Sequence, residues 1–117
     1  MDFFTRLFGS KTPTITVTEL FEKLKNAKRP LILDVRQPDE FRSGHISGAK
    51  LVPLGNLKNS LTDLPKQREI VCVCASGNRS RSAARMLVSE GFQVLNMQGG
   101  MSAWQQANLP VKKGMSS

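Results

Sequence analysis

Short runs of β-branched and apolar residues alternate along this chain with segments of helical periodicity. Runs of this kind occupy residues 31–35 (LILDV), 69–73 (EIVCV) and 92–97 (FQVLNM). Nearly continuous apolar runs are typical of strands covered on both faces, as in a parallel sheet whose crossover connections are helices. The alternation therefore predicts an α/β domain with a central, mainly parallel sheet.

Two weaker strands and a capped helix fit the same order. Residues 14–16 and 49–52 have the pattern of short strands. Thr16 and Glu19 form a capping-box pattern, in which each side chain can accept a hydrogen bond from the backbone N–H of the other residue. A helix is expected after this box, with apolar residues that share one face: Leu20, Phe21 and Leu24.

The clearest helix is expected over residues 79–90. Gly91 suits the left-handed position that ends a helix. Arg81 and Arg85 lie on one face of this segment. Its apolar stripe lies on another face and consists of Ala83, Ala84, Leu87 and Val88.

Three shorter helices complete the prediction. Pro38 suits the first turn of a helix that runs through Phe41. A brief helix is expected around residues 57–61, and a last one at 101–107. Trp104, in the last helix, is expected to be a core or rim aromatic residue.

The length of 117 residues allows one hydrophobic core and leaves no room for a second of useful size. A domain is expected at residues 14–111, after a Phe-rich extension at 1–13 and before a flexible tail at 112–117. If the extension is helical, its apolar side chains share a face: Phe3, Phe4, Leu7 and Phe8. Packing on the domain or a mobile end is favoured for it, and contact with a partner or a membrane surface is the alternative.

The net charge of +8 raises the question of a polyanionic partner. The 17 basic residues are scattered, tyrosine is absent, and the single tryptophan lies near the C-terminus. This is a poor match to an aromatic-lined nucleic-acid groove, so no nucleic acid is expected as a partner. The charge instead favours small anionic molecules through long-range attraction.

Neither a membrane span nor a secretory signal is apparent in the sequence. No apolar run approaches the roughly 18 residues that a membrane span needs. The N-terminus lacks a long apolar stretch followed by a small-residue cleavage site. No transmembrane span is therefore expected, and the cytoplasm is the expected location.

The two cysteines, Cys72 and Cys74, are separated by one residue. A disulfide between them would close a strained ring, and a metal site would need more ligands than the single His45 can add. Free thiols are the better interpretation, and no metal is expected. Cys72 has apolar neighbours on both sides and is expected to be a small buried hydrophobic residue.

Cys74 ends its strand and is followed by a short polar loop and then by a helix. Ligands bind at the carboxyl ends of parallel strands, and a helix N-terminus supplies free N–H groups and a partial positive charge. Gly77 allows the backbone to turn several N–H groups toward the sulfur, and Arg79 adds a fixed positive charge. These features predict a thiolate with a lowered pKa, which describes an activated nucleophile.

Three ordered blocks of the sequence resemble the rhodanese family, in its single-domain, thiosulfate sulfurtransferase-like form. VCVCASGNRSRSAARML resembles that family's active-site segment, in which a cysteine opens a C-x-x-G-x-R-S loop. LILDVRQPDEFRSGHISGAKLVP resembles its D-V-R-x-x-x-E-F-x-x-G-H-I-x-G-A segment, and GFQVLNMQGGMSAWQQANLPV resembles its L-x-G-G-x-x-x-W ending. The resemblance covers roughly residues 14–111 and implies a five-stranded parallel sheet with helices on both faces.

The resemblance implies that Cys74 is the catalytic residue. It would take a sulfane sulfur from thiosulfate or a persulfide donor and pass it to a thiophilic acceptor such as cyanide or a thiol, without a cofactor. Ala75 stands where many thiosulfate-active relatives carry a basic residue, so weaker use of thiosulfate and preference for another donor are expected. The implied substrate-binding loop consists of Ala75, Ser76, Gly77, Asn78, Arg79 and Ser80.

Polar residues outside the loop are expected to have supporting roles. Asp34, Arg36 and Glu40 lie near the carboxyl end of the strand at 31–35, close enough for a charge network. Structural pairing explains them, because removing one partner of a buried pair is costly. His45 is expected to order its loop by hydrogen bonding, and a role as general acid or base is the alternative.

Two other functions remain as alternatives. A cysteine phosphatase or an arsenate reductase also holds a thiolate in an anion cradle. Those phosphatases use C-x5-R, however, whereas Cys74 and Arg79 form C-x4-R. A non-enzymatic sulfur carrier or interaction module would use the same scaffold, with a protein as sulfur donor or acceptor.

Overall fold

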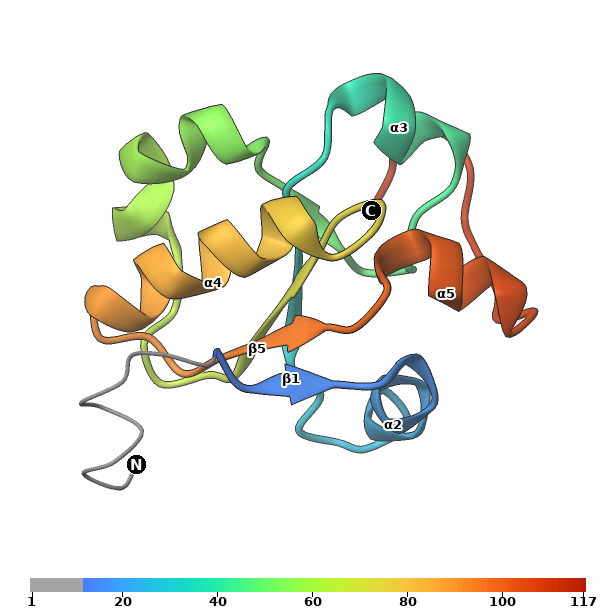
Figure 1. Cartoon of the computed structure of the whole chain (residues 1–117), viewed down its shortest axis with the longest axis horizontal. Coiled ribbons are helices and arrows are strands. Elements are labelled where there is room, and N and C mark those ends of the chain that lie inside the picture. Colours follow the sequence, from blue (N-terminus) through green and yellow to red (C-terminus); the bar gives the residue numbers. More distant parts are fainter. Residues whose placement is uncertain (1–11) are drawn as a thin grey trace.

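The structure, a computed structural model, describes residues 12–117. In these residues five strands form a parallel sheet in the order β1-β5-β4-β2-β3 (Figure 1). The predicted α/β fold with a five-stranded parallel sheet is therefore confirmed. The strands are β1 (Thr14–Ile15), β2 (Leu31–Asp34), β3 (Lys50–Leu51), β4 (Ile70–Val73) and β5 (Val94–Met97).

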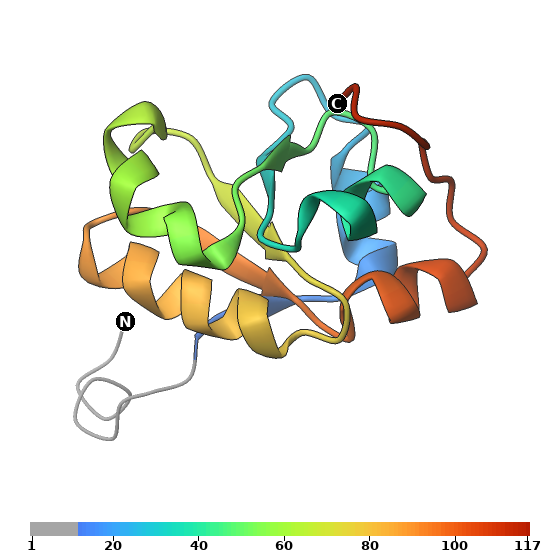
Figure 2. The same cartoon turned by 90° about the horizontal axis from the view of Figure 1, so that it is seen from above.

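Helices cover both faces of this sheet, as Figure 2 shows. One face is covered by α4 and the 3₁₀ helix η1, and the other by α2, α3 and α5. The side chains of the central strand β4 alternate between two buried cores: Cys72 packs on the side of α4 and η1, and Val71 and Val73 on the other. The helices are α2 (Val17–Lys23), α3 (Pro38–Ser43), η1 (Leu54–Asp63), α4 (Asn78–Ser89) and α5 (Gly100–Gln106).

Local sequence signals explain where several helices begin. The capping box predicted before α2 is present, since the backbone N–H of Thr16 donates to Glu19 Oε1 at 2.9 Å and that of Glu19 donates to Thr16 Oγ1 at 3.1 Å. Helix α3 begins with Pro38, as predicted, and the backbone N–H of Gln37 donates to Glu40 Oε1 at 3.0 Å. This second hydrogen bond fixes the direction of the Glu40 carboxylate.

Two details differ from the sequence-based expectation. The brief helix expected around 57–61 is a longer 3₁₀ segment, anchored on the core by the buried Leu57. The assignment of Val88 to the apolar stripe of α4 is wrong, because its side chain is 43% exposed. The buried residues Ala83, Ala84 and Leu87 centre the stripe elsewhere, and a rotation of about 100° per residue carries Val88 past its edge.

The C-terminal residues, for which a flexible tail is predicted, contact the domain through the backbone. The N–H of His45 donates to Lys112 O at 2.9 Å, and the N–H of Lys112 donates to His45 O at 2.8 Å. The N–H of Gly114 donates to Arg42 O at 2.9 Å. The flexibility of residues 112–117 stays a prediction, and motion of this tail would have to break these hydrogen bonds.

Two predictions concern the N-terminal extension and the membrane. The apolar residues of the extension lie outside the described residues: Phe3, Phe4, Leu7 and Phe8. Within residues 12–117, none of the helices has both the length and the apolar character needed to cross a bilayer.

Candidate functional site

Cys74 lies directly after β4 and before the loop that enters α4, at the carboxyl edge of the sheet. Figure 1 shows this loop in yellow where it leads into α4. The first turn of α5 packs against this loop, because the N–H of Met101 donates to Cys74 O at 2.8 Å and that of Ser102 to Ala75 O at 3.0 Å. Gly100 permits the close approach: a Cβ at this position would lie 2.5 Å from the carbonyl oxygens of Cys74 and Ala75. The backbone around Cys74, in the connection from β4 to α4, is therefore held by the segment that follows β5.

The sulfur of Cys74 accepts hydrogen bonds from the loop and the first turn of α4. The N–H of Gly77 lies 3.1 Å from Cys74 Sγ, and the hydroxyl of Ser80 lies 3.3 Å from it. Gly77 has a φ of +105°, a conformation that side-chain-bearing residues rarely adopt, and it turns its N–H toward the sulfur. The loop and the first turn of α4 thus place two hydrogen-bond donors beside Cys74 Sγ.

Hydrogen bonding outweighs burial in setting the pKa of Cys74. The residue is fully buried, and burial alone raises the pKa of its thiol. The Ser80 hydroxyl, with the backbone N–H groups of Ser80, Gly77 and Ser76, lowers it by more, so that the pKa of Cys74 lies below its ordinary value. The Cys74 thiol is therefore more acidic than an ordinary cysteine.

Cys72 lies in the same core and behaves oppositely. Burial, with a smaller effect from the charge of Cys74, raises the pKa of Cys72 to about 12. Its thiol stays protonated at neutral pH and packs as an apolar group. The two cysteines, which strand geometry alone does not distinguish, are thus separated by their hydrogen-bond partners.

Arg79 does not stand as an isolated positive charge beside the loop. Its Nη1 and Nη2 donate to Glu40 Oε1 and Oε2, both at 2.8 Å, in a two-pronged ion pair that joins α4 to α3. The hydrogen bond from Arg79 is the main cause that lowers the pKa of Glu40 to about 2. The sequence does not indicate that Arg79 pairs with Glu40, because the two residues lie far apart in the chain.

Known proteins resemble this chain in sequence and in structure. The family model for the rhodanese-like domain matches residues 16–107. The chain belongs to the rhodanese-like domain family. A sulfurtransferase of Allochromatium vinosum is 34% identical over 93 residues, which cover 79% of this chain and 87% of that protein.

Other relatives of this rhodanese-like domain carry related names. A thiosulfate sulfurtransferase of Shewanella oneidensis is 36% identical over 95 residues, covering 80% of this chain and 93% of that protein. A putative sulfur carrier protein of Bacillus subtilis is 35% identical over 97 residues, covering 82% and 52%. A rhodanese-related protein of Thermoplasma volcanium has a similar structure, with a TM-score of 0.80 and 29% identity over 86% of this chain and 97% of that one. The predicted membership in the rhodanese family is confirmed.

Asn96 is a residue of the rhodanese-like domain's site that the sequence analysis missed. It lies buried on β5, and its Oδ1 lies 2.5 Å from the Ser80 hydroxyl, whose single hydrogen is shared between Asn96 Oδ1 and Cys74 Sγ as acceptors. Its Nδ2 donates to Gly77 O at 3.2 Å. Asn96 therefore contacts both residues whose donors reach Cys74 Sγ. The sequence signal that points to Asn96 is the presence of a polar residue near the end of the mainly apolar run FQVLNM.

Asp34 and Arg36 form a separate, buried ion pair. Arg36 Nε lies 2.9 Å from Asp34 Oδ1, and Arg36 Nη2 lies 2.8 Å from Asp34 Oδ2. Nη2 of Arg36 also donates to Gly44 O at 2.9 Å, which ties the end of β2 to the loop after α3. The charged side chains thus form two separate ion pairs, Asp34 with Arg36 and Glu40 with Arg79.

His45 is buried away from hydrogen-bond contact with the Cys74 loop. Its ring stacks on Phe41, with centroids 3.6 Å apart, and its two nitrogens lie 2.8 Å from Phe41 O and 2.7 Å from Ser116 O. These contacts fit the predicted ordering role. Of the remaining loop residues, Ser76 and Asn78 are exposed and Ala75 is half-buried.

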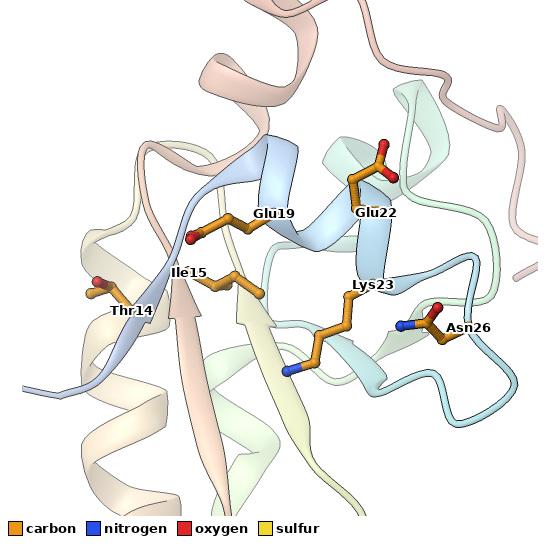
Figure 3. A pocket seen from close by; sticks show the side chains of 6 residues that line it. All are labelled: Thr14, Ile15, Glu19, Glu22, Lys23 and Asn26. Atoms are coloured by element: carbon orange, nitrogen blue, oxygen red, sulfur yellow. The ribbon is translucent and has the colours of Figure 1, made fainter.

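A surface pocket lies outside the Cys74 loop, and two of its charged side chains have partners within the domain. Residues 12–117 contain no group of three or more His, Cys, Asp or Glu side chains arranged to hold a metal ion. Figure 3 shows a surface pocket between β1 and α2, but Glu19 in it caps α2 and Lys23 pairs with Glu69. The lining residues are Thr14, Ile15, Glu19, Glu22, Lys23 and Asn26.

Proposed function

We propose that this rhodanese-like domain is a sulfurtransferase that moves a sulfane sulfur through a persulfide on Cys74. The donor is thiosulfate or a persulfide, and the acceptor is a thiophile such as cyanide or a thiol. The family and the relatives named above support a sulfurtransferase or sulfur-carrier role in general. The observation that carries the finer proposal is the lowered pKa of Cys74, whose sulfur faces the donors of Gly77 and Ser80.

The reaction has two steps in this proposal. In the first, the Cys74 thiolate attacks the outer sulfur of the donor, a sulfur–sulfur bond forms on the enzyme, and the donor leaves as sulfite or as a thiol. In the second, the acceptor attacks the outer sulfur of the Cys74 persulfide, and the Cys74 thiolate leaves. The donors of Gly77 and Ser80 face Cys74 Sγ, which carries the negative charge before the first step and again after the second. The residues of the chain need no cofactor for either step.

Mass spectrometry tests the proposal directly. After incubation with thiosulfate or a low-molecular-weight persulfide, Cys74 should gain one sulfur, about 32 Da by atomic mass. Cys74→Ser should lose sulfur transfer with the fold intact, and Cys72→Ala should largely retain it. Transfer that is lost in Cys72→Ala and retained in Cys74→Ser would contradict the assignment.

A sulfur carrier is the second candidate function. A relative named as a putative sulfur carrier protein favours it, since 82% of this chain aligns with that protein. A carrier would acquire the extra sulfur on Cys74 but would turn over thiosulfate and cyanide slowly. Turnover measured beside the extent of loading distinguishes the two functions.

A further inference from the structure

The only cation of the substrate-binding loop is paired within the domain. Between Cys74 and Ser80, Arg79 is the one charged residue, and both terminal nitrogens of its guanidinium bind Glu40 at 2.8 Å. Charge interaction with Cys74 is among the smaller causes that raise the pKa of Arg79, after its hydrogen bond with Glu40. Arg79 precedes Ser80, whose hydroxyl lies 3.3 Å from Cys74 Sγ, so its charge lies on the same turn of α4 that faces the sulfur, but a carboxylate already offsets it.

Helix α3 presents the Glu40 carboxylate to Arg79 in a fixed direction. Oε1 of Glu40 accepts from the backbone N–H of Gln37 at 3.0 Å as well as from Arg79, so two elements hold it. The carboxyl group, with a pKa of about 2, stays charged throughout the neutral range. The nearby guanidinium of Arg36 is also occupied, because Asp34 pairs with it.

We propose that Glu40 is a specificity residue that, by occupying Arg79, favours sulfur donors of low charge over the dianion thiosulfate. The preferred class is donors of at most one negative charge, such as alkyl persulfides and thiosulfonates. This inference rests on the proposed sulfurtransferase function. A dianion must displace a built-in carboxylate to gain the attraction of Arg79, and until then it approaches both Glu40 and the Cys74 thiolate as like charges.

Two donors of similar shape isolate the effect of charge. Thiosulfate reacts as Cys74–S⁻ + S–SO₃²⁻ → Cys74–S–S⁻ + SO₃²⁻. The methanethiosulfonate anion replaces one oxyanion by a methyl group and reacts as Cys74–S⁻ + CH₃SO₂–S⁻ → Cys74–S–S⁻ + CH₃SO₂⁻. Each step forms the same sulfur–sulfur bond on Cys74 and breaks one in the donor, and no oxidant or proton is consumed. The two donors differ by one unit of charge.

The experiment compares Glu40→Gln with Asp39→Asn on these two donors. The amide introduced by Glu40→Gln can still accept the N–H of Gln37, but it no longer offsets the charge of Arg79. Asp39→Asn removes the same charge from the same helix at a residue without an ion pair in the described part of the chain. We expect Glu40→Gln to raise the ratio of kcat/KM for thiosulfate to that for methanethiosulfonate by about 5-fold, the scale of one half-exposed charge pair. Asp39→Asn should change this ratio by less than about 2-fold.

A double variant and a loading measurement make the outcomes distinct. With Arg79→Gln already present, adding Glu40→Gln should leave the ratio unchanged, because the effect acts through Arg79. An equal change in Glu40→Gln and Asp39→Asn, or an unchanged or lower ratio in Glu40→Gln, overturns the inference if Cys74 still gains a sulfur. If neither donor loads Cys74 in the unmodified protein, the proposed function itself fails.

Discussion

At the scale of single residues, hydrogen bonds decide which cysteine is reactive. Cys72 and Cys74 are both fully buried and belong to the same core, yet their pKa values move in opposite directions. The difference comes from donors that reach only one sulfur, above all the hydroxyl of Ser80 and the N–H of Gly77. Desolvation is a penalty that both thiols share, so it does not distinguish them.

Removing the Ser80 hydroxyl should make Cys74 less acidic. In Ser80→Ala the side-chain hydrogen bond that lowers the pKa of Cys74 is lost, so the pKa rises. The alkylation rate of Cys74 with iodoacetamide follows the thiolate fraction, so its midpoint should shift to higher pH and the rate at neutral pH should fall by about 3-fold or more, the scale of one hydrogen bond. Ser82→Ala, an exposed position on the same helix, is the control and should leave the midpoint in place. An unchanged midpoint in Ser80→Ala would show that the backbone donors suffice.

The sequence predicts the residues of the cradle better than it predicts their supports. Cys74 and the loop follow from a local strand–loop–helix pattern, which a short stretch of sequence contains. The contacts of Asn96 with Ser80 and of Glu40 with Arg79 join distant segments, and their existence depends on how the strands are ordered in the sheet. Without that order, local periodicity gives no reason to pair them.

Among the helices and strands, the first turn of α5 holds the Cys74 loop in place. The strands that run through the centre of the sheet were predicted well, because β2 and β4 are buried on both faces and their sequences are nearly all apolar. The extent of η1 was not predicted, since a 3₁₀ segment anchored on one leucine leaves a weak periodic signal. Around Cys74, the decisive contact is the close approach of Gly100 and the first turn of α5.

A side chain at Gly100 should disturb this approach. In Gly100→Ala the new Cβ would lie 2.5 Å from backbone atoms of Cys74 and Ala75, at a φ of +59° that favours glycine. We expect a loss of unfolding free energy of about 2–4 kcal/mol in urea denaturation, and slower alkylation of Cys74. Gly55→Ala provides the matched control, because a Cβ there meets nothing within 4 Å. Equal stability of the two variants would mean that the turn moves away without cost.

Across the protein as a whole, the C-terminal residues contact the end of α3 and the loop that follows it. Residues 112–117 bond to the backbone of His45 and Arg42, and Ser116 O lies 2.7 Å from the His45 ring nitrogen Nε2. His45 is fully buried, so loss of these partners would leave polar groups without hydrogen bonds until water enters. A docked tail would therefore add to the stability of the domain, whereas the flexible tail predicted from the sequence would not.

Deleting residues 112–117 tests which description holds. If the tail is docked, the deletion removes the bridge between His45 and Lys112 and should lower the unfolding free energy by about 1–3 kcal/mol. Hydrogen exchange at the amides of His45 and Lys112 should also be slow in the full chain. A deletion without effect on stability, together with fast exchange at Lys112, would support a flexible tail instead.

The protonation state of the Cys72 thiol determines how a sulfur or oxygen atom added to Cys74 can be removed. The chain has two cysteines, and the thiol of Cys72, buried with a pKa of about 12, is a poor nucleophile at neutral pH. A disulfide between Cys72 and Cys74 is therefore disfavoured as a means of releasing the added sulfur or of reversing oxidation. Whatever Cys74 acquires, whether sulfur or oxygen, must be removed by a reductant or nucleophile that comes from outside the domain.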